Sequence, residues 1–143
     1  MEHLSSTEKL AHLWQQKREG ILSVYFTAGY PSLGNTMEIA HGLQEAGADL
    51  IEIGIPYSDP VADGPTIQES NQQALQNGMT LEVLMQQLDC QEHHVEIPII
   101  LMGYFNPILQ YGVERFCSDC HHRGISGLII PDLPIQEYLD HSK

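Results

Sequence analysis

The sequence predicts an α/β fold in which strands and helices alternate along the chain. Short apolar runs typical of buried strands occur at residues 21–27, 50–54, 97–102 and 127–130, and amphipathic stretches typical of helices lie between them. The unit of helix, glycine and apolar strand occurs twice, as EAGADLIEIG and as HRGISGLIIP. Alternation of this kind favours a parallel sheet whose strands are joined by crossover helices.

The helices expected between these strands carry their own boundary signals. The sequence S-S-T-E near the amino terminus resembles a capping box, Thr80 can cap a later helix, and Pro65 suits a first helical position. Glycines follow several of the stretches and can end them. Helices are expected at residues 4–18, 35–46, 65–77, 80–88 and 113–123, with a loop or broken helix at 103–112 and the start of another helix at 135–143.

Two parallel architectures fit this pattern, an open doubly wound sheet and a (β/α)8 barrel. The glycine-rich fingerprint of dinucleotide-binding sheets does not follow the first strand, which disfavours that version of the open sheet. A barrel needs about 250 residues and eight strands. The chain has 143 residues, enough for one domain and for about half of a barrel.

Composition and charge exclude several classes of protein. The formal net charge of −13 disfavours non-specific binding to nucleic acids and to anionic membranes. The longest apolar run, residues 97–102, is far too short to span a bilayer. Three cysteines without an apparent secretory signal indicate a reducing compartment, so we expect a cytoplasmic protein without a disulfide framework.

The stretch LIEIGIPYSDPVADGPTIQ, residues 50–68, is where we expect the chemistry. Glu52 interrupts an apolar strand, where an ionised carboxylate is costly, and Asp59 and Asp63 follow in the next loop. Strand ends and the loops after them carry the active sites of parallel α/β folds. The alternative is that Glu52 faces solvent and the two aspartates only stabilise turns and helix caps.

Residues 52–68 strongly resemble the signature of the tryptophan synthase alpha chain family, with EIG followed by PYSDPVADGPTIQ. The resemblance continues at AGYP (28–31), AGAD (46–49), LMGYFNP (101–107) and IPDLP (130–134). These segments look like the family's first βα turn, the entry to its second strand, and the ends of its third and fourth strands. The resemblance therefore covers nearly the whole chain.

This resemblance implies a (β/α)8 barrel that cleaves indole-3-glycerol phosphate to indole and glyceraldehyde 3-phosphate by a retro-aldol route. Glu52 matches the family's general acid/base, Asp63 matches the carboxylate that hydrogen-bonds the indole N–H, and Tyr104 matches an active-site tyrosine. A carboxyl group at a dry strand end would have a raised pKa, suited to exchanging protons near neutral pH.

The resemblance also implies contacts to substrate and partner. Tyr25, Leu101 and Ile129 fall where the family packs apolar side chains against the indole ring, and a core-filling role is the alternative for each. Asp59 and Pro60 lie in the loop that the family uses against its beta chain in an α2β2 heterotetramer, although Asp59 also suits a simple turn. Pyridoxal phosphate would belong to that beta chain, and no cofactor is expected here.

One competing motif lies at residues 117–121, where CSDCH fits the pattern of covalent haem attachment. Cys117 and Cys120 share a helical stripe with Val113 and Phe116, so we expect both cysteines to face the core. His121 and His122, like the pair at residues 93–94, are expected at solvated helix ends. The pattern therefore disfavours a haem or zinc site.

The resemblance finally implies that residues 1–143 form a single domain, the amino-terminal half of the family's barrel. The later loops that hold the substrate phosphate in this family have no counterpart in the sequence. We therefore expect a truncated chain that is inactive alone, and either poorly soluble or dimerised through open sheet edges. Two alternatives stay open: another barrel lyase or isomerase acting on a phosphorylated sugar, and a non-catalytic remnant that only binds a partner chain.

Overall fold

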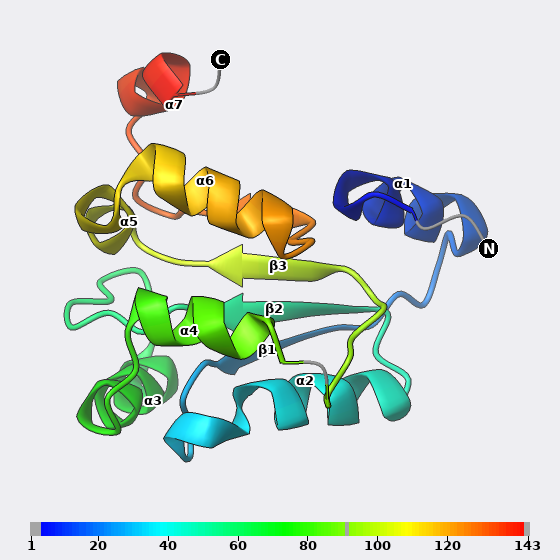
Figure 1. Ribbon diagram of the computed structural model, residues 1–143, viewed down its shortest axis with the longest axis horizontal. Coiled ribbons are helices and arrows are strands. Elements are labelled where there is room, and N and C mark those ends of the chain that lie inside the picture. Colours follow the sequence, from blue (N-terminus) through cyan, green and yellow to red (C-terminus); the bar gives the residue numbers. More distant parts are fainter. Residues whose placement is uncertain (1–3, 91, 142–143) are drawn as a thin grey trace.

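The computed structural model, which describes residues 4–90 and 92–141, contains one parallel four-stranded sheet (Figure 1). Its strands follow chain order across the sheet: β1 (Ser23–Thr27), β2 (Leu50–Gly54), β3 (Ile99–Met102) and β4 (Gly127–Ile129). This order and direction confirm the alternating α/β arrangement expected from the sequence. The strands end at the same side of the sheet, so the loops that follow them gather there.

Helices separate the strands, as the periodicity predicts. In chain order they are α1 (Ser6–Gln16), the short 3₁₀ helix η1 (Leu33–Asn35), α2 (Thr36–Glu45), α3 (Pro65–Gln76), α4 (Leu81–Leu88), α5 (Phe105–Tyr111), α6 (Val113–His122) and α7 (Ile135–His141). In Figure 1, α4 and α6 cover the face of the sheet that is turned to the viewer. Among the described residues, no helix combines the length and the apolar character that are needed to cross a bilayer.

Local signals account for several of these boundaries. The backbone N–H of Ser5 donates to Glu8 Oε2 (2.7 Å) at the start of α1, and Val83 N–H donates to Thr80 Oγ1 (3.1 Å) at the start of α4. Residues 103–112, expected to be a loop or a broken helix, contain the short helix α5. Gly112 then separates α5 from α6 with φ of 105°, a left-handed conformation that favours glycine.

The two faces of the sheet have different surroundings. Ile51 and Ile53 of β2 are fully buried and pack, with Leu101 of β3, against core side chains of α2, α3, α4 and α6. Side chains alternate along a strand, so Glu52 and Gly54 lie on the opposite, concave face. Burial of the helix-facing side chains is the main stabilising contribution to this sheet.

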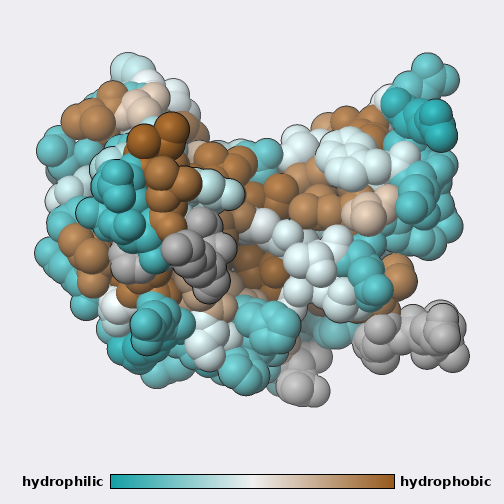
Figure 2. Space-filling view, turned by 90° about the horizontal axis from the view of Figure 1, so that it is seen from above, coloured by the Kyte–Doolittle hydropathy of each residue, from teal (hydrophilic) through white to brown (hydrophobic). Residues whose placement is uncertain are grey.

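The concave face is largely uncovered in the part of the chain that the structure describes. Residues 4–90 and 92–141 place no strand beyond β1 on one edge or beyond β4 on the other. Leu128 and Ile129 of β4 are accordingly 40% and 39% exposed. Seen from above in Figure 2, apolar surface lines a hollow between the α1 side and the α6–α7 side of the molecule. These features are the expected ones for half of a closed barrel.

Candidate active site

Glu52 lies at the centre of β2 on the concave face of the sheet. It pairs in register with Tyr25 of β1 and Ile100 of β3, so these three side chains share one face. Its carboxylate Oε1 accepts a hydrogen bond from Ser23 Oγ at 3.1 Å. The side chain is half-buried rather than excluded from water, because the concave face is open within the described residues.

Asp63 is held in place at the end of the loop that follows β2. Tyr104 Oη donates a hydrogen bond to Asp63 Oδ2 (3.0 Å) and accepts one from the backbone N–H of Ala62 (3.0 Å). The carbonyl of Asp63 also accepts a hydrogen bond from Gln68 Nε2 at 2.8 Å, in the first turn of α3. One carboxylate of the candidate site is therefore oriented by a tyrosine from the next strand–helix connection.

Tyr104 is almost fully buried, with 2% of its surface exposed. Burial raises the pKa of its hydroxyl, and the hydrogen bond to Asp63 with the charge of that carboxylate raises it further, while the Ala62 N–H opposes the shift. The ring of Tyr57 lies 5.3 Å from its ring, centroid to centroid. Tyr104 therefore stays a neutral donor to Asp63 at neutral pH.

Tyr25 lies beside Glu52, because the two residues pair in register across β1 and β2. Burial raises the pKa of the Tyr25 hydroxyl, a hydrogen bond with Thr27 opposes this shift, and the negative charges of Asp63 and Glu52 raise the pKa further. The structure thus places Tyr25 beside Glu52 and Tyr104 against Asp63, and all four residues were selected from the sequence.

Ile129 and Leu101, the other two expected substrate contacts, lie on opposite faces. Ile129 pairs with Met102, which pairs with Gly54, so it faces the same side as Glu52. Leu101 pairs with Ile53 and is 1% exposed in the helix-facing core. The expected contact of Leu101 with a ligand on the concave face is therefore wrong, and its neighbours Ile100 and Met102 face that side instead.

The loop after β2 presents one of the two expected partner-contact residues to solvent. Asp59 is exposed and Val61 is 74% exposed, whereas Pro60 between them is buried. This loop and α3 line a cavity of about 550 Å³, to which Tyr57, Asp59 and Gln72 contribute. Pro60 can shape the loop but presents little surface to a partner.

The two cysteines of α6 point in different directions. Cys120 is buried in the core, and burial raises the pKa of its thiol to about 12. Cys117 is exposed, so the expectation that it faces the core is wrong. His121 and His122 are exposed at the end of the helix, as expected. Across residues 4–90 and 92–141, no group of three or more His, Cys, Asp or Glu side chains is arranged to hold a metal ion.

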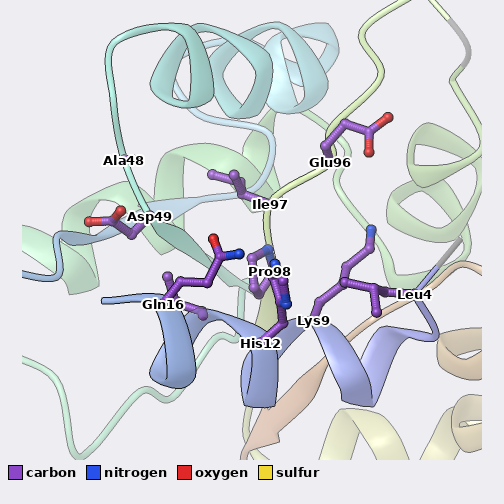
Figure 3. Close-up of a pocket in the computed structure, with 10 residues that line it drawn as sticks. Leu4, Lys9, His12, Gln16, Ala48, Asp49, Glu96, Ile97 and Pro98 are labelled. Atoms are coloured by element: carbon purple, nitrogen blue, oxygen red, sulfur yellow. The ribbon is translucent and has the colours of Figure 1, made fainter. Parts of the chain in front are cut away.

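A separate cavity lies at the opposite end of the strands. It measures about 440 Å³, is open to solvent on one side and lies between α1 and the residues that precede β2 and β3 (Figure 3). Lys9, His12 and Gln16 line it from α1, and Asp49 and Pro98 line it from the sheet side. Because Asp49 and Pro98 come directly before strands, this cavity is remote from the loop that carries Asp63.

Sequence reasoning missed the hydroxyl groups around the site. Ser23 alternates with Tyr25 along β1, so a strict reading of the strand period could have placed it beside Glu52. Thr27 and Ser70 are buried, and their hydroxyl oxygens lie 2.7 Å apart. Nothing in the sequence indicates this second contact, because it joins residues 43 positions apart.

A parallel series of strand–helix units in chain order, with ionisable side chains at and after its strands, has the architecture of one half of a (β/α)8 barrel. Comparison with known proteins identifies the family. The sequence profile of the tryptophan synthase alpha chain matches residues 10–143. The chain therefore belongs to the tryptophan synthase alpha chain family.

Relatives and solved structures agree with this assignment. The tryptophan synthase alpha chain of Flavobacterium psychrophilum is 59% identical over 128 residues, and that of Parabacteroides distasonis is 55% identical over 131 residues. These matches cover 90% and 92% of this chain, respectively, and 51% of each relative. The chain thus spans about half the length of the curated relatives it matches.

The crystal structure of tryptophan synthase subunit alpha from Legionella pneumophila superimposes with a TM-score of 0.87 at 36% identity. This superposition covers 97% of this chain and 53% of that one. A ligand-free tryptophan synthase from Mycobacterium tuberculosis gives a TM-score of 0.83 at 34% identity, over 92% of this chain and 54% of that one. The four-stranded sheet is therefore the half-barrel expected from the sequence.

Proposed function

We propose that this chain carries the acid–base half of an active site that cleaves indole-3-glycerol phosphate to indole and glyceraldehyde 3-phosphate. The reaction is a carbon–carbon lyase step in tryptophan biosynthesis. The observation that supports it best is the placement of the two carboxylates: Glu52 lies on the concave face of β2, and Asp63 is held by Tyr104 in the loop that follows that strand. The choice of substrate is based on membership of the tryptophan synthase alpha chain family.

In this proposal Glu52 first acts as an acid. Its O–H bond breaks as a C–H bond forms at C3 of the indole ring, and the ring becomes a cation with charge on its N–H. Asp63, oriented by the Tyr104 hydroxyl at 3.0 Å, accepts a hydrogen bond from that N–H and stabilises the cation. A fixed carboxylate is effective here because it needs no reorientation during the reaction.

The carboxylate that remains on Glu52 then acts as a base. It removes the proton from the hydroxyl group of the glycerol chain next to the ring. The carbon–carbon bond breaks, its electron pair returns to the ring to give neutral indole, and the former hydroxyl carbon becomes the aldehyde of glyceraldehyde 3-phosphate. Atoms and charges balance, and no cofactor is needed for these steps.

We expect no turnover by the 143-residue chain alone. About half the length of its relatives lies outside the stretch that they share with it. Binding of the remote phosphate group provides energy that helps to orient the reacting end of a substrate, so its loss lowers turnover as well as affinity. Clear indole release by the purified chain would contradict this expectation.

We also propose a partner chain, which of the two chains binds the cofactor, and a cellular compartment. The partner is a pyridoxal-phosphate-dependent beta chain, with two copies of each chain in the assembly, and this chain holds no cofactor. Exposed Asp59 and Val61 at the tip of the β2 loop are the residues available for that contact. The compartment proposed is the cytoplasm. A pull-down with a beta chain would test the partner, and retention of binding by an Asp59→Ala, Val61→Ser double variant would exclude this loop tip.

The activity is testable in a completed barrel, which we define as this chain fused to the remaining residues of the Flavobacterium psychrophilum relative. Glu52→Gln and Asp63→Asn should each lower indole release by about 10²- to 10⁴-fold. Glu69→Gln, an exposed change on α3, is the matched control and should leave the rate unchanged. Wild-type activity in either site variant would overturn the role assigned to that residue.

A further inference from the structure

Tyr104 lies between two backbone hydrogen bonds that both lead to β4 and the turn after it. On one side, the N–H of Gly103 donates to the carbonyl of Ile129 at 3.0 Å. On the other side, the N–H of Phe105 donates to Oδ1 of the Asp132 carboxylate at 2.8 Å. The backbone of Tyr104 is therefore held on both sides by the strand and turn of the next unit of the sheet.

Asp132 supplies a cap that the residue before α5 does not supply. Tyr104 occupies the N-cap position of α5 with an extended backbone, φ −74° and ψ 154°, and its side chain makes no capping hydrogen bond. A short carboxylate side chain is among the best acceptors for the free N–H groups at a helix start, and its negative charge is favourable there. The N–H of Phe105 is thus satisfied from the neighbouring unit rather than from the residue that precedes α5.

A tight turn presents the Asp132 carboxylate to α5. The N–H of Leu133 donates to the carbonyl of Ile130 at 3.3 Å, which closes a four-residue turn with Pro131 in its second position. Proline is favoured at that position because its ring presets the backbone angle that the turn needs. The turn therefore gives Asp132 a defined place, although its side chain is exposed within the described residues.

The side chain of Tyr104 carries this restraint to the candidate site. Its ring is buried and lies 5.3 Å from that of Tyr57, centroid to centroid. Its hydroxyl donates to Asp63 Oδ2 and accepts from the N–H of Ala62, both at 3.0 Å. A closely packed ring has little freedom to move relative to its own backbone. A shift of the Tyr104 backbone therefore moves the hydroxyl that orients Asp63.

We propose that Asp132 is a positioning residue for the proposed reaction. By accepting the N–H of Phe105 it fixes the backbone of Tyr104, and Tyr104 in turn holds the Asp63 carboxylate where the cationic ring forms. This role rests on the proposed function, because it assumes that Asp63 stabilises that cation. It extends the candidate site from the β2 loop to the turn after β4, and Asp132 acts there without touching a reacting atom.

Hydrogen exchange in the 143-residue chain tests this coupling without any activity. In Asp132→Ala the amide of Phe105 should exchange about tenfold faster, and the amide of Ala62 should also accelerate, because the Tyr104 hydroxyl that accepts from it is displaced. Asp132→Asn keeps an oxygen acceptor and should leave both amides near their wild-type rates. Asp140→Ala removes an exposed carboxylate on α7 and is the matched control, with no change at either amide.

Two results of that experiment would overturn the proposal. Unchanged exchange at Ala62 would mean that Asp132 does not act through Tyr104, whatever happens at Phe105. An equal acceleration at Ile51, whose N–H donates to the carbonyl of Pro98 in the sheet, would indicate a general loss of stability instead of a local restraint.

Kinetics in the completed barrel test the role in turnover. Asp132→Ala should lower kcat about fivefold while KM stays within about twofold, and Asp132→Asn should keep kcat within about twofold of the wild type. In a Tyr104→Phe background, Asp132→Ala should cause no further loss, because the hydroxyl through which it acts is already gone. Asp140→Ala should leave kcat unchanged. Normal kcat in Asp132→Ala, or full additivity with Tyr104→Phe, would contradict the proposal.

Failure of this inference is distinguishable from failure of the proposed function. If Asp63→Asn retains full indole release, the role of Asp63 in the reaction is wrong, whatever Asp132 does. If Asp63→Asn is impaired but Asp132→Ala has normal kcat, the proposed function holds and the role of Asp132 is wrong.

Discussion

The two ends of the sheet differ in how closely the elements around them pack. At the carboxyl end, side chains bind the backbone of the loops: Asn71 Oδ1 accepts from Tyr57 N–H (2.9 Å), and Asp132 Oδ1 accepts from Phe105 N–H (2.8 Å). At the amino end, α1 has no buried side chain, and a cavity of about 440 Å³ separates it from the starts of β2 and β3. Trp14 of α1 is 53% exposed.

The difference follows from where side chains of the half-barrel have to be positioned accurately. A carboxylate that must meet one atom of a substrate has to be fixed in position, and hydrogen bonds from neighbouring loops achieve this for Asp63. None of the candidate site residues lies at the amino end, so looser packing there has no cost for the proposed chemistry. Stability comes instead from the helix-facing core between the two ends.

The largest expected loss of stability is for a substitution in the helix-facing core, and a similar substitution on the concave face should cost much less. Leu101→Ala should lower the free energy of unfolding by about 2–5 kcal/mol, because it leaves a cavity in the core. Ile129→Ala on the exposed face should cost less than about 1 kcal/mol. Urea unfolding followed by circular dichroism measures both. Equal losses would mean that the two faces have been assigned wrongly.

The close approach of Tyr25 to Gly54 should give the next largest effect. Gly54→Ala should lower the free energy of unfolding by about 1–3 kcal/mol, because its methyl group overlaps the Tyr25 ring. In a Tyr25→Leu background the same change should cost clearly less, as a double-mutant cycle would show. Additive effects of the two changes would contradict the described contact.

The hydrogen bonds at the carboxyl end should contribute somewhat less. Tyr104→Phe should cost about 1–2 kcal/mol, since the N–H of Ala62 and the carboxylate of Asp63 both lose a buried partner. Tyr57→Phe is the control, because the Tyr57 ring remains to stack on residue 104. Hydrogen exchange at Ala62 should accelerate only in Tyr104→Phe, and an unchanged exchange rate would contradict the role of the hydroxyl.

Alkaline pH should weaken the folded state through one buried and two half-buried tyrosines. Burial raises the folded-state pKa of Tyr25, Tyr104 and Tyr111 above the ordinary value of 10.0. The unfolded chain therefore loses these protons first, and stability that is complete below about pH 10 is lost as the pH rises through the higher folded-state values. Urea unfolding at about pH 8 and about pH 10.5 measures the loss. It should be smaller in Tyr104→Phe, and an equal loss there would count against this account.

The smallest expected effect is at the amino end. Leu13→Ala in α1 should cost less than about 1 kcal/mol, because this half-buried side chain faces the cavity rather than a packed core. Hydrogen exchange should be faster in α1 than in α4, which buries Leu81, Leu84 and Met85. A loss comparable to that of Leu101→Ala would remove the contrast between the two ends.

Local sequence signals predicted the order of the helices and strands, because each signal agrees with the structure that its residues adopt in the fold. The β2 strand begins and ends where its apolar pattern does, and Thr80 caps α4 as expected. Helix α5 was not clear from the sequence because Pro107 interrupts the pattern. In the structure that proline lies in the first turn of the helix, where its missing N–H costs little.

The candidate site was less accessible to sequence reasoning than the fold. Glu52 and Asp63 stand out as carboxylates in and after a buried strand. Leu101 was misplaced because residues 99–102 are continuously apolar, and such a run does not reveal which side chains face the helices. The hydroxyl chain of Thr27 and Ser70 joins distant residues, so only the folded structure shows it.

In the proposed mechanism, Glu52 transfers a proton to C3 of the indole ring while Asp63 stabilises the cation. Exchange of the C3 hydrogen of indole for deuterium, followed by NMR in D2O with the completed barrel, tests this transfer directly. We expect catalysed exchange with the wild-type residues, almost none with Glu52→Gln, and slower exchange with Asp63→Asn. Exchange at the wild-type rate in Glu52→Gln would contradict the proposed proton transfer.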